Sequence, residues 1–148
     1  MRSLWQEPAR RELLTRLEKL TPTTRGAWGR MTAPEMICHI NESIRMCFGD
    51  IETKAKRVPW RHPPLKQLVM YWLPWPKGVP TAPELLARVP TSWDTDVAEC
   101  RALIERFGTE TRKRDVWPRH PAFGSMTAEQ WGRLTYRHMD HHWTQFNI

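Results

Sequence analysis

The sequence predicts an all-α protein, a four-helix bundle whose helices run up, down, down and up. Four segments carry apolar residues at helical spacing, and no segment of useful length alternates apolar and polar residues as a strand would. A long, proline-rich connection separates the second of these segments from the third. Short links join antiparallel helices, whereas a long link permits a crossover between parallel ones. The length of 148 residues predicts a single domain, residues 1–148.

The first helix is expected from Pro8 to Leu20. Arginine and glutamate cover most of its surface, and one face carries a stripe of leucines: Leu13, Leu14, Leu17 and Leu20. The polar run 21–24, which contains a proline, ends the helix. We therefore expect the leucine face to pack into the core.

The second helix is expected from Ala33 to about Phe48. Thr32 and Glu35 have the spacing of a capping box, and a proline is tolerated in the first turn. Gly49 stops the helix. The apolar face consists of Met36, Ile37, Ile40, Ile44 and Cys47. A histidine, His39, is expected at the margin of this face.

The connection from residue 50 to about residue 90 has a different character. Eight of the 13 prolines fall in it, which forbids a long helix: Pro59, Pro63, Pro64, Pro74, Pro76, Pro80, Pro83 and Pro90. Only residues Leu65 to Leu73 are expected to form a short helix. A connection of this length is typical of a crossover, of a functional lid, or of both.

The third long helix begins after Thr91 or Ser92 and is expected to end at Gly108. Its apolar stripe consists of Trp93, Val97, Cys100, Ile104 and Phe107. The fourth runs from Thr127 to about Phe146. Its start repeats a phrase that precedes the second helix, since Gly-x-Met-Thr-Ala stands at 29–33 and again at 124–128. The repeat favours two matched helices about a pseudo-twofold axis.

Composition limits the classes of function. The formal net charge is +7, but the basic residues are spread along the chain without a nucleic-acid motif. This pattern favours a solvated surface, or attraction for an anionic small molecule, and argues against a nucleic-acid partner. No stretch resembles a transmembrane helix or a signal peptide, so we expect a cytoplasmic protein with no membrane partner. Its three cysteines are expected to be reduced and buried: Cys38, Cys47 and Cys100.

Nine tryptophans in a chain of this size indicate large, flat contact surfaces. Such surfaces occur in a core, in the wall of a pocket or at a subunit interface. The aromatic residues Trp131, Tyr71 and Trp72 are the candidates for a pocket wall. A homodimer formed through the tryptophan-rich crossover is a further expectation.

His138 and His142 stand four residues apart, on the inward and mostly apolar side of the last helix. Two interpretations remain open for this pair. Both rings could bind one divalent metal, or both could be core histidines bonded to nearby polar groups. If the second and fourth helices pack side by side with a stagger, His39 becomes the third ligand. Three imidazoles would leave a fourth position for water or substrate, and zinc, nickel and iron are all compatible with such a set.

Three stretches carry a resemblance to a known superfamily. They are Trp28-Gly29-x-Met31-Thr32-x-x-x-Met36-x-Cys38-His39-Ile40, Phe123-Gly124-x-Met126-Thr127-x-x-x-Trp131 and Arg137-His138-x-Asp140-His141-His142-x-x-Gln145-Phe146. With them the chain resembles the DinB/YfiT-like superfamily, most of all a DinB-like branch whose members are mostly of unknown function. The resemblance covers nearly the whole chain. It implies a four-helix bundle with a divalent metal on His39, His138 and His142.

Better-understood members of this superfamily include transferases and isomerases that use mycothiol or bacillithiol, a metal-dependent hydrolase and the iron-binding domain of ergothioneine-forming sulfoxide synthases. The last group has a glutamate two residues after the second histidine of the pair. This chain has Thr144 there, which argues against an oxygenase of that type. The resemblance thus implies a metal-dependent thiol S-transferase or hydrolase that acts on a small molecule, with a low-molecular-weight thiol as one candidate partner. The alternative is a non-catalytic metal-binding or structural protein.

Two further residues are candidates for a catalytic role. Glu42 could orient His39 or exchange a proton, and His141 flanks the face that carries the histidine pair. For His141, a structural or surface role is the alternative. Glu35 is expected to be engaged in its capping box, and the Cys38 side chain is expected to lie in the core.

Overall fold

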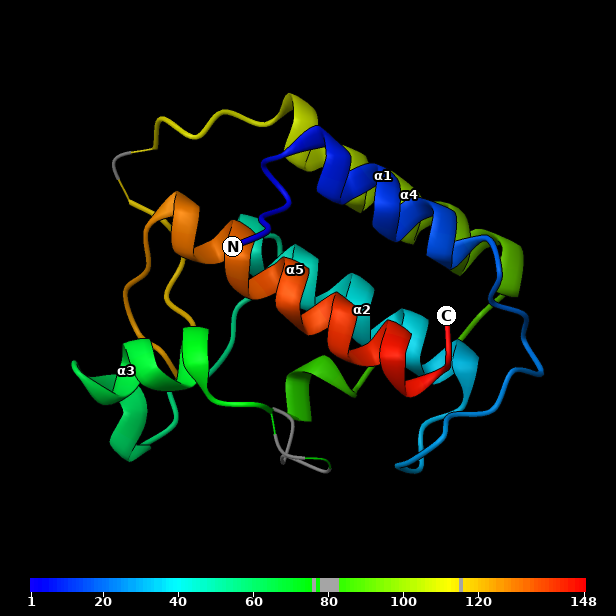
Figure 1. Ribbon diagram of the computed structural model, residues 1–148, viewed down its shortest axis with the longest axis horizontal. Helices are drawn as coiled ribbons and strands as arrows, with labels where there is room; N and C mark the ends of the chain where they lie inside the picture. Colours follow the sequence, from blue (N-terminus) through cyan, green and yellow to red (C-terminus); the bar gives the residue numbers. More distant parts are fainter. Residues whose placement is uncertain (76, 78–82, 115) are drawn as a thin grey trace.

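All regular elements of the computed structural model are helical (Figure 1). The structure describes residues 1–75, 77, 83–114 and 116–148. Its α-helices are α1 (Glu7–Leu17), α2 (Ala33–Phe48), α3 (Leu65–Gln67), α4 (Trp93–Thr109) and α5 (Ala128–Gln145). Two 3₁₀ turns (Pro59–Arg61 and Pro83–Leu85) and a π-helical turn (Leu68–Trp72) complete the set. Within these residues no strand forms, so the all-α prediction is confirmed.

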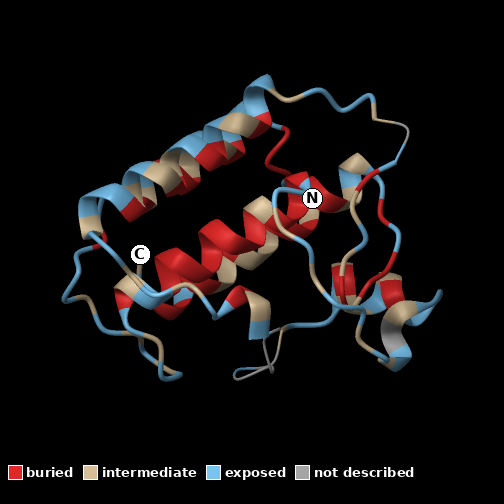
Figure 2. Ribbon diagram, turned by 180° about the vertical axis from the view of Figure 1, so that it is seen from behind, coloured by how far each residue is buried: buried red, intermediate tan, exposed pale blue. Residues whose placement is uncertain are grey.

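The four long helices contact one another in a closed ring. α2 packs against α4 and α5, and α1 packs against the same two helices. In Figure 1, α2 and α5 cross the middle of the molecule side by side. Burial is deepest along α2, which is almost entirely red in Figure 2. Its residues therefore meet neighbours on nearly every side. None of the described helices is long and apolar enough to cross a membrane.

The start and end of α2 follow the prediction. The Thr32 side chain accepts a hydrogen bond from the Glu35 amide, and Glu35 Oε2 accepts one from the Thr32 amide at 2.8 Å. Both partners of the capping box are thus engaged, as expected for Glu35. Gly49 ends the helix in the left-handed region, with φ +84°.

The repeated phrase in the sequence is repeated in the structure. Thr32 and Thr127 cap α2 and α5 with almost the same backbone angles, φ −75° and ψ 165° against φ −79° and ψ 164°. Gln130 completes the second capping box. The glycine of each phrase has a positive φ, +81° at Gly29 and +67° at Gly124. The same local chemistry therefore starts both helices that carry the candidate histidines.

Two predicted helix ends were wrong. α1 stops at Leu17 rather than at Leu20, although the Leu20 side chain remains buried. α4 continues through Gly108 to Thr109. A Cβ atom at position 108 would lie 2.8 Å from the Arg10 guanidinium. Arg10 can move its guanidinium away, so this contact does not by itself require a glycine, and the helix runs one residue past it.

In its described residues the proline-rich connection forms only short helices and turns, as predicted. Its expected helix from Leu65 to Leu73 is present as α3 followed by the π-helical turn. Arg137 of α5 donates hydrogen bonds to the carbonyl oxygens of Val69, Met70 and Leu73 and so fastens this segment to α5. Pro76 and Pro80, two of the prolines that marked the connection, lie outside the described residues.

Candidate metal centre

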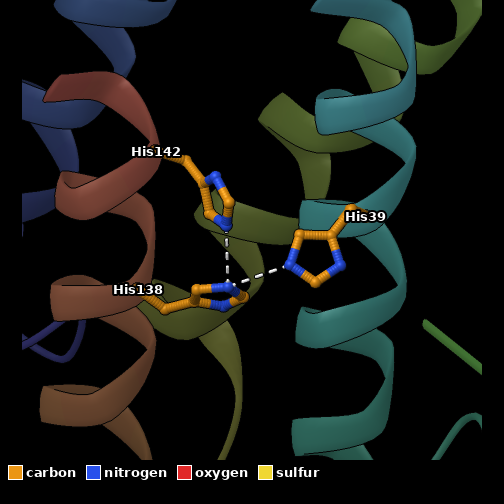
Figure 3. Close-up of side chains that lie close together, drawn as sticks. All are labelled: His39, His138 and His142. Atoms are coloured by element: carbon orange, nitrogen blue, oxygen red, sulfur yellow. Dashed lines mark hydrogen bonds between the residues drawn. The ribbon is translucent and has the colours of Figure 1, made fainter. Parts of the chain in front are cut away.

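Three histidine side chains from two helices point toward one another (Figure 3). Nε2 of His138 lies 3.0 Å from Nε2 of His39 and 3.1 Å from Nε2 of His142. All three candidate ligand atoms lie within 4.8 Å of one another. The structure thus brings together the three residues that the sequence singled out.

Helix geometry explains the convergence. His138 and His142 are one turn apart on α5 and share a face, while His39 comes from the neighbouring helix α2. His39 is only 2% exposed and His142 only 7% exposed. The position expected for His39, at the margin of the core face, was therefore wrong. The side chain is buried because the crossover segment around Leu85 covers that flank of α2.

The tautomer of His39 follows from its partner. Its Nδ1 atom lies 3.3 Å from the main-chain carbonyl oxygen of Leu85. A carbonyl oxygen can only accept, so Nδ1 carries the proton. In the neutral ring, Nε2 is then left with a lone pair that faces the other two histidines.

A longer relay sets the tautomer of His142. The Gln145 side-chain amide donates to the carbonyl oxygen of Trp28 at 2.7 Å, which turns its Oε1 toward His142 Nδ1 at 2.8 Å. His142 therefore also donates through Nδ1 and keeps a lone pair on Nε2. Glycine is needed beside this relay, since a Cβ atom at Gly29 would lie 2.6 Å from the Gln145 amide nitrogen.

With these two tautomers, the space between the three rings holds more lone pairs than protons, so a cation could be bound there. Nε2 of His138 faces two lone pairs, but a neutral ring has at most one proton on that nitrogen. At most one of the two short nitrogen–nitrogen contacts can therefore be a hydrogen bond, and the other leaves an Nε2 lone pair without a donor. A shared cation would satisfy all three Nε2 atoms together, provided that His138 carries its own proton on Nδ1.

A proton is a poor candidate for that cation. Burial lowers the pKa of His39 to about 4 and that of His142 to about 3, despite the opposing effect of their Nδ1 hydrogen bonds. Burial, and then the two neighbouring imidazoles, lower the pKa of His138 well below its ordinary value. All three rings are therefore neutral near pH 7, which is the form that binds metal.

The donor set fits a divalent metal ion. Two imidazole nitrogens bound to one tetrahedral zinc ion are roughly 3.3 Å apart, given bond lengths of about 2.0–2.1 Å. The two closest pairs here are within a few tenths of an ångström of that spacing. Nδ1 donors to a carbonyl and to an amide are also the usual means of holding a metal-bound imidazole in place. The three histidines could therefore hold a metal ion.

Comparison with known protein families places the chain in a family. Residues 14–147, a span that includes all three histidines, match the family described as "Protein of unknown function (DUF1569)". The chain belongs to this family. Searches of curated proteins and of solved structures gave no match. Because the family description names no activity, the function of this DUF1569 chain has to be argued from its site.

In this DUF1569 chain a partly buried ion-pair network holds the segment whose carbonyl orients His39. Arg88, three residues after Leu85, pairs with Asp96 at 2.5 Å and with Glu99 at 2.6 Å. Asp96 is only 1% exposed and also accepts from the Thr91 amide. The sequence predicted no role for Asp96 at the site. Its role as the anchor of the 85–91 segment was missed because no local pattern connects it to His39.

The two catalytic candidates have different surroundings. Glu42 is buried and pairs with Arg45 at 3.1 Å and with Arg88 at 3.4 Å, so it belongs to the network that holds the crossover. His141 is partly buried, with its ring centre 5.3 Å from that of His142. Neither belongs to the cluster of three, and His141 lines a cleft.

That cleft lies beside the histidine cluster and has a volume of about 310 Å³. Its aromatic walls are Trp28 and Trp75. The expectation that Trp131, Tyr71 and Trp72 form the wall was wrong. Trp131 is 1% exposed and Trp72 is 77% exposed, so one is in the core and the other is on the surface.

The cysteines contribute no nucleophile. All three are buried and free, as predicted for Cys38. Burial raises the pKa of Cys38 to about 11 and that of Cys100 to about 12. Their thiols therefore stay protonated at neutral pH and pack as small apolar groups.

Proposed function

We propose that the chain holds one divalent metal ion on His39, His138 and His142 and acts on a small molecule, as a thiol S-transferase or a hydrolase. One observation carries the proposal. Three Nε2 atoms converge while the Nδ1 atoms of His39 and His142 are committed as donors to protein oxygens. Zinc, nickel and iron all suit imidazole ligands.

The type of chemistry follows from the number of ligands. A bound divalent metal lowers the pKa of a coordinated water or thiol, so that it becomes a nucleophile near neutral pH. Three protein ligands are typical of catalytic sites that keep a position for water or substrate, whereas structural zinc sites use four. The protein residues supply orientation, through the Leu85 carbonyl and the Gln145 amide. His138 is the most exposed of the three and marks the side from which a small molecule can approach.

We also infer that this family is a DinB/YfiT-like one and that its helices form an up-down-down-up bundle. The closed ring of helix contacts and the matched caps of α2 and α5 support this. In Figure 1 the colours along α2 and α4 advance in the opposite direction to those along α1 and α5. The motifs around the three histidines are the further support.

Metal analysis is the first test of the proposal. Purified protein should contain close to one equivalent of zinc, nickel or iron by elemental analysis. His142→Ala should lose it, while His62→Ala, which removes an exposed histidine of the crossover, should keep it. A normal metal content in His142→Ala would overturn the proposed ligand set.

Cobalt substitution separates a catalytic site from a metal that only stabilises the fold. Cobalt(II)-loaded protein should change its visible absorption when 2-mercaptoethanol is added, because a thiolate can enter the open position. An unchanged spectrum would indicate a closed site and would favour the non-catalytic alternative. In that case chelation should still lower the melting temperature.

A further inference from the structure

The cleft with the two tryptophans lies next to the histidine cluster, although none of the three cluster histidines lines it. Besides Trp28 and Trp75 it is lined by residues of α5 and of the crossover: Pro74, Lys77, Arg137, Asp140, His141 and Thr144. The ring centre of Trp75 lies 5.6 Å from that of His138. A molecule in this cleft is therefore separated from the imidazole cluster by about one side chain.

Charge in the cleft is unbalanced. Lys77 and Arg137 bring two positive charges, and Asp140 brings the single negative one. Asp140 is already paired with Arg16 of α1 at 2.6 Å. Among the described residues no carboxylate pairs with Lys77, whose ammonium lies 4.5 Å from the ring centre of Trp28. The cleft thus offers a cation that a ligand can neutralise.

Arg137 contributes its charge but few free donors. Its guanidinium already donates to carbonyl oxygens of the 69–73 segment and lies 5.3 Å from the ring centre of Trp75. The hydrogen bonds to a ligand therefore fall to Lys77, while Arg137 holds the Trp75 wall in place.

The walls are flat and apolar. The ring centre of His141 lies 6.0 Å from that of Trp28 and 5.9 Å from that of Trp75. Faces of this kind favour a planar group, which stacks or makes edge contacts with aromatic rings. A volume of about 310 Å³ is at the lower end of the range for small-molecule sites.

We infer that this cleft binds a small organic anion that joins a planar apolar group to a carboxylate, with the carboxylate at Lys77 and the planar group against Trp28, Trp75 and His141. The inference rests on the proposed function, since it assigns the substrate class of that site. It requires an anion on a flat body and excludes a sugar or a cationic amine.

A larger depression elsewhere does not have these properties. It covers residues 55–62 of the crossover, has a volume of about 630 Å³ and is also basic, through Lys56, Arg57 and Arg61. Among the described residues, none of α5 lines it. It could attract an anion but could not present it to the three histidines.

Three naphthalene derivatives that differ mainly in charge test the inference. Isothermal titration calorimetry would compare 2-naphthoate, 2-naphthylmethanol and 2-naphthylmethylammonium on the full chain. We expect 2-naphthoate to bind roughly tenfold more tightly than the neutral alcohol, as a charge-assisted hydrogen bond implies. The ammonium compound should bind more weakly than either. Equal affinities for the acid and the alcohol would overturn the inference.

Two lysine variants test whether the carboxylate of 2-naphthoate binds at Lys77. Lys77→Met should weaken 2-naphthoate about tenfold and change 2-naphthylmethanol less than twofold, while Lys113→Met, an exposed lysine outside the cleft, should change neither. An unchanged affinity of Lys77→Met for 2-naphthoate would contradict the inference. Both variants should keep the metal content of the unmodified chain. If that chain contains no metal but still selects 2-naphthoate through Lys77, the cleft assignment stands and the proposed metal chemistry fails.

Discussion

The histidine cluster and His120 are two places where the protein withdraws imidazole from water, and they use the ring in opposite ways. In the cluster, His39 and His142 each donate a hydrogen bond through Nδ1. The Nε2 lone pair of each ring then points toward His138. At His120, Nδ1 accepts hydrogen bonds from the amides of Ala122 and Phe123, at 3.1 Å and 3.2 Å. Burial lowers the pKa at both places, to about 3 for His120.

This difference shows that burial and a low pKa do not identify a metal ligand. His120 is a neutral ring that closes a turn, with its acceptor satisfied by the backbone. The cluster is distinguished by the commitment of Nδ1 to oxygen acceptors, which fixes where the free lone pairs point. Whether Nδ1 donates or accepts a hydrogen bond therefore distinguishes a candidate metal ligand from a structural histidine.

The largest expected effect is loss of the metal from the cluster alone. His39→Ala should weaken zinc binding by more than about a hundredfold. Loss of a residue that only hydrogen-bonds to a ligand lowers metal affinity by about 10–100-fold, and loss of the ligand itself should cost more. His120→Asn should change it less than twofold, since an asparagine oxygen can accept the same backbone amides. Competition titration with a chromophoric chelator measures both. Equal losses in the two variants would break the distinction between the two regions.

The next effect concerns the relay behind His142. Gln145→Leu should weaken zinc binding by about 10–100-fold, because the Nδ1 proton loses its acceptor and the ring loses its orientation. Gln145→Glu is the matched control, since it keeps an oxygen for Nδ1 while it gives up the bond to Trp28. It should bind zinc within a few-fold of the unmodified chain. A Gln145→Leu variant with unchanged affinity would show that the relay is not needed.

Local pattern made much of this arrangement predictable. The spacing of His138 and His142, the boxes that start at Thr32 and Thr127, and the long helices all follow from 3.6-residue periodicity and capping chemistry. The orientation of His39 does not. Its acceptor is a main-chain carbonyl 46 residues away, in a segment without periodicity, and any residue type can supply such an oxygen.

The same limit applied to the helix ends and to the cleft. Gly108 resembles a helix stop in the sequence, but α4 continues through it to Thr109. Trp28 and Trp75 lie on loops, and their positions depend on how the connection folds back on α5. The helix ends and the positions of these tryptophans depend on tertiary contacts between distant segments. Such contacts cannot be predicted from local sequence patterns.

A smaller effect is expected from the anchor of the Leu85 carbonyl. Arg88→Met should weaken zinc binding by roughly three- to tenfold, since the carbonyl stays in the chain but loses its ion-pair anchor to Asp96 and Glu99. Arg101→Met removes an exposed pair with Glu18 and should have no effect on the metal. The chelator titration applies again. An effect of Arg101→Met as large as that of Arg88→Met would contradict a specific role for the network.

In the metal-free protein the three cluster histidines, whose pKa values burial also lowers, add to the pH dependence of stability. The smallest effect is the contribution of His120 alone. Its folded-state pKa of about 3 lies below the ordinary value of 6.5, so the folded protein binds fewer protons than the unfolded chain. Above pH 6.5 the ring is neutral in both states and contributes nothing. As the pH falls below 6.5, the unfolded state takes up a proton and the free energy of unfolding decreases, by about 1.4 kcal/mol between pH 7.5 and pH 5.5.

His120→Asn isolates that contribution, because asparagine does not titrate. The variant should be less stable than the unmodified chain at pH 7.5, and the difference should shrink by about 1.4 kcal/mol at pH 5.5. Urea unfolding of the metal-free proteins at the two pH values measures it. A constant difference would mean that the His120 ring takes up a proton in the folded state. The lone pair on its Nδ1 accepts the backbone amides whenever the other nitrogen carries the proton. A charged ring would have to break both of these hydrogen bonds, which is why we expect the pH-dependent result.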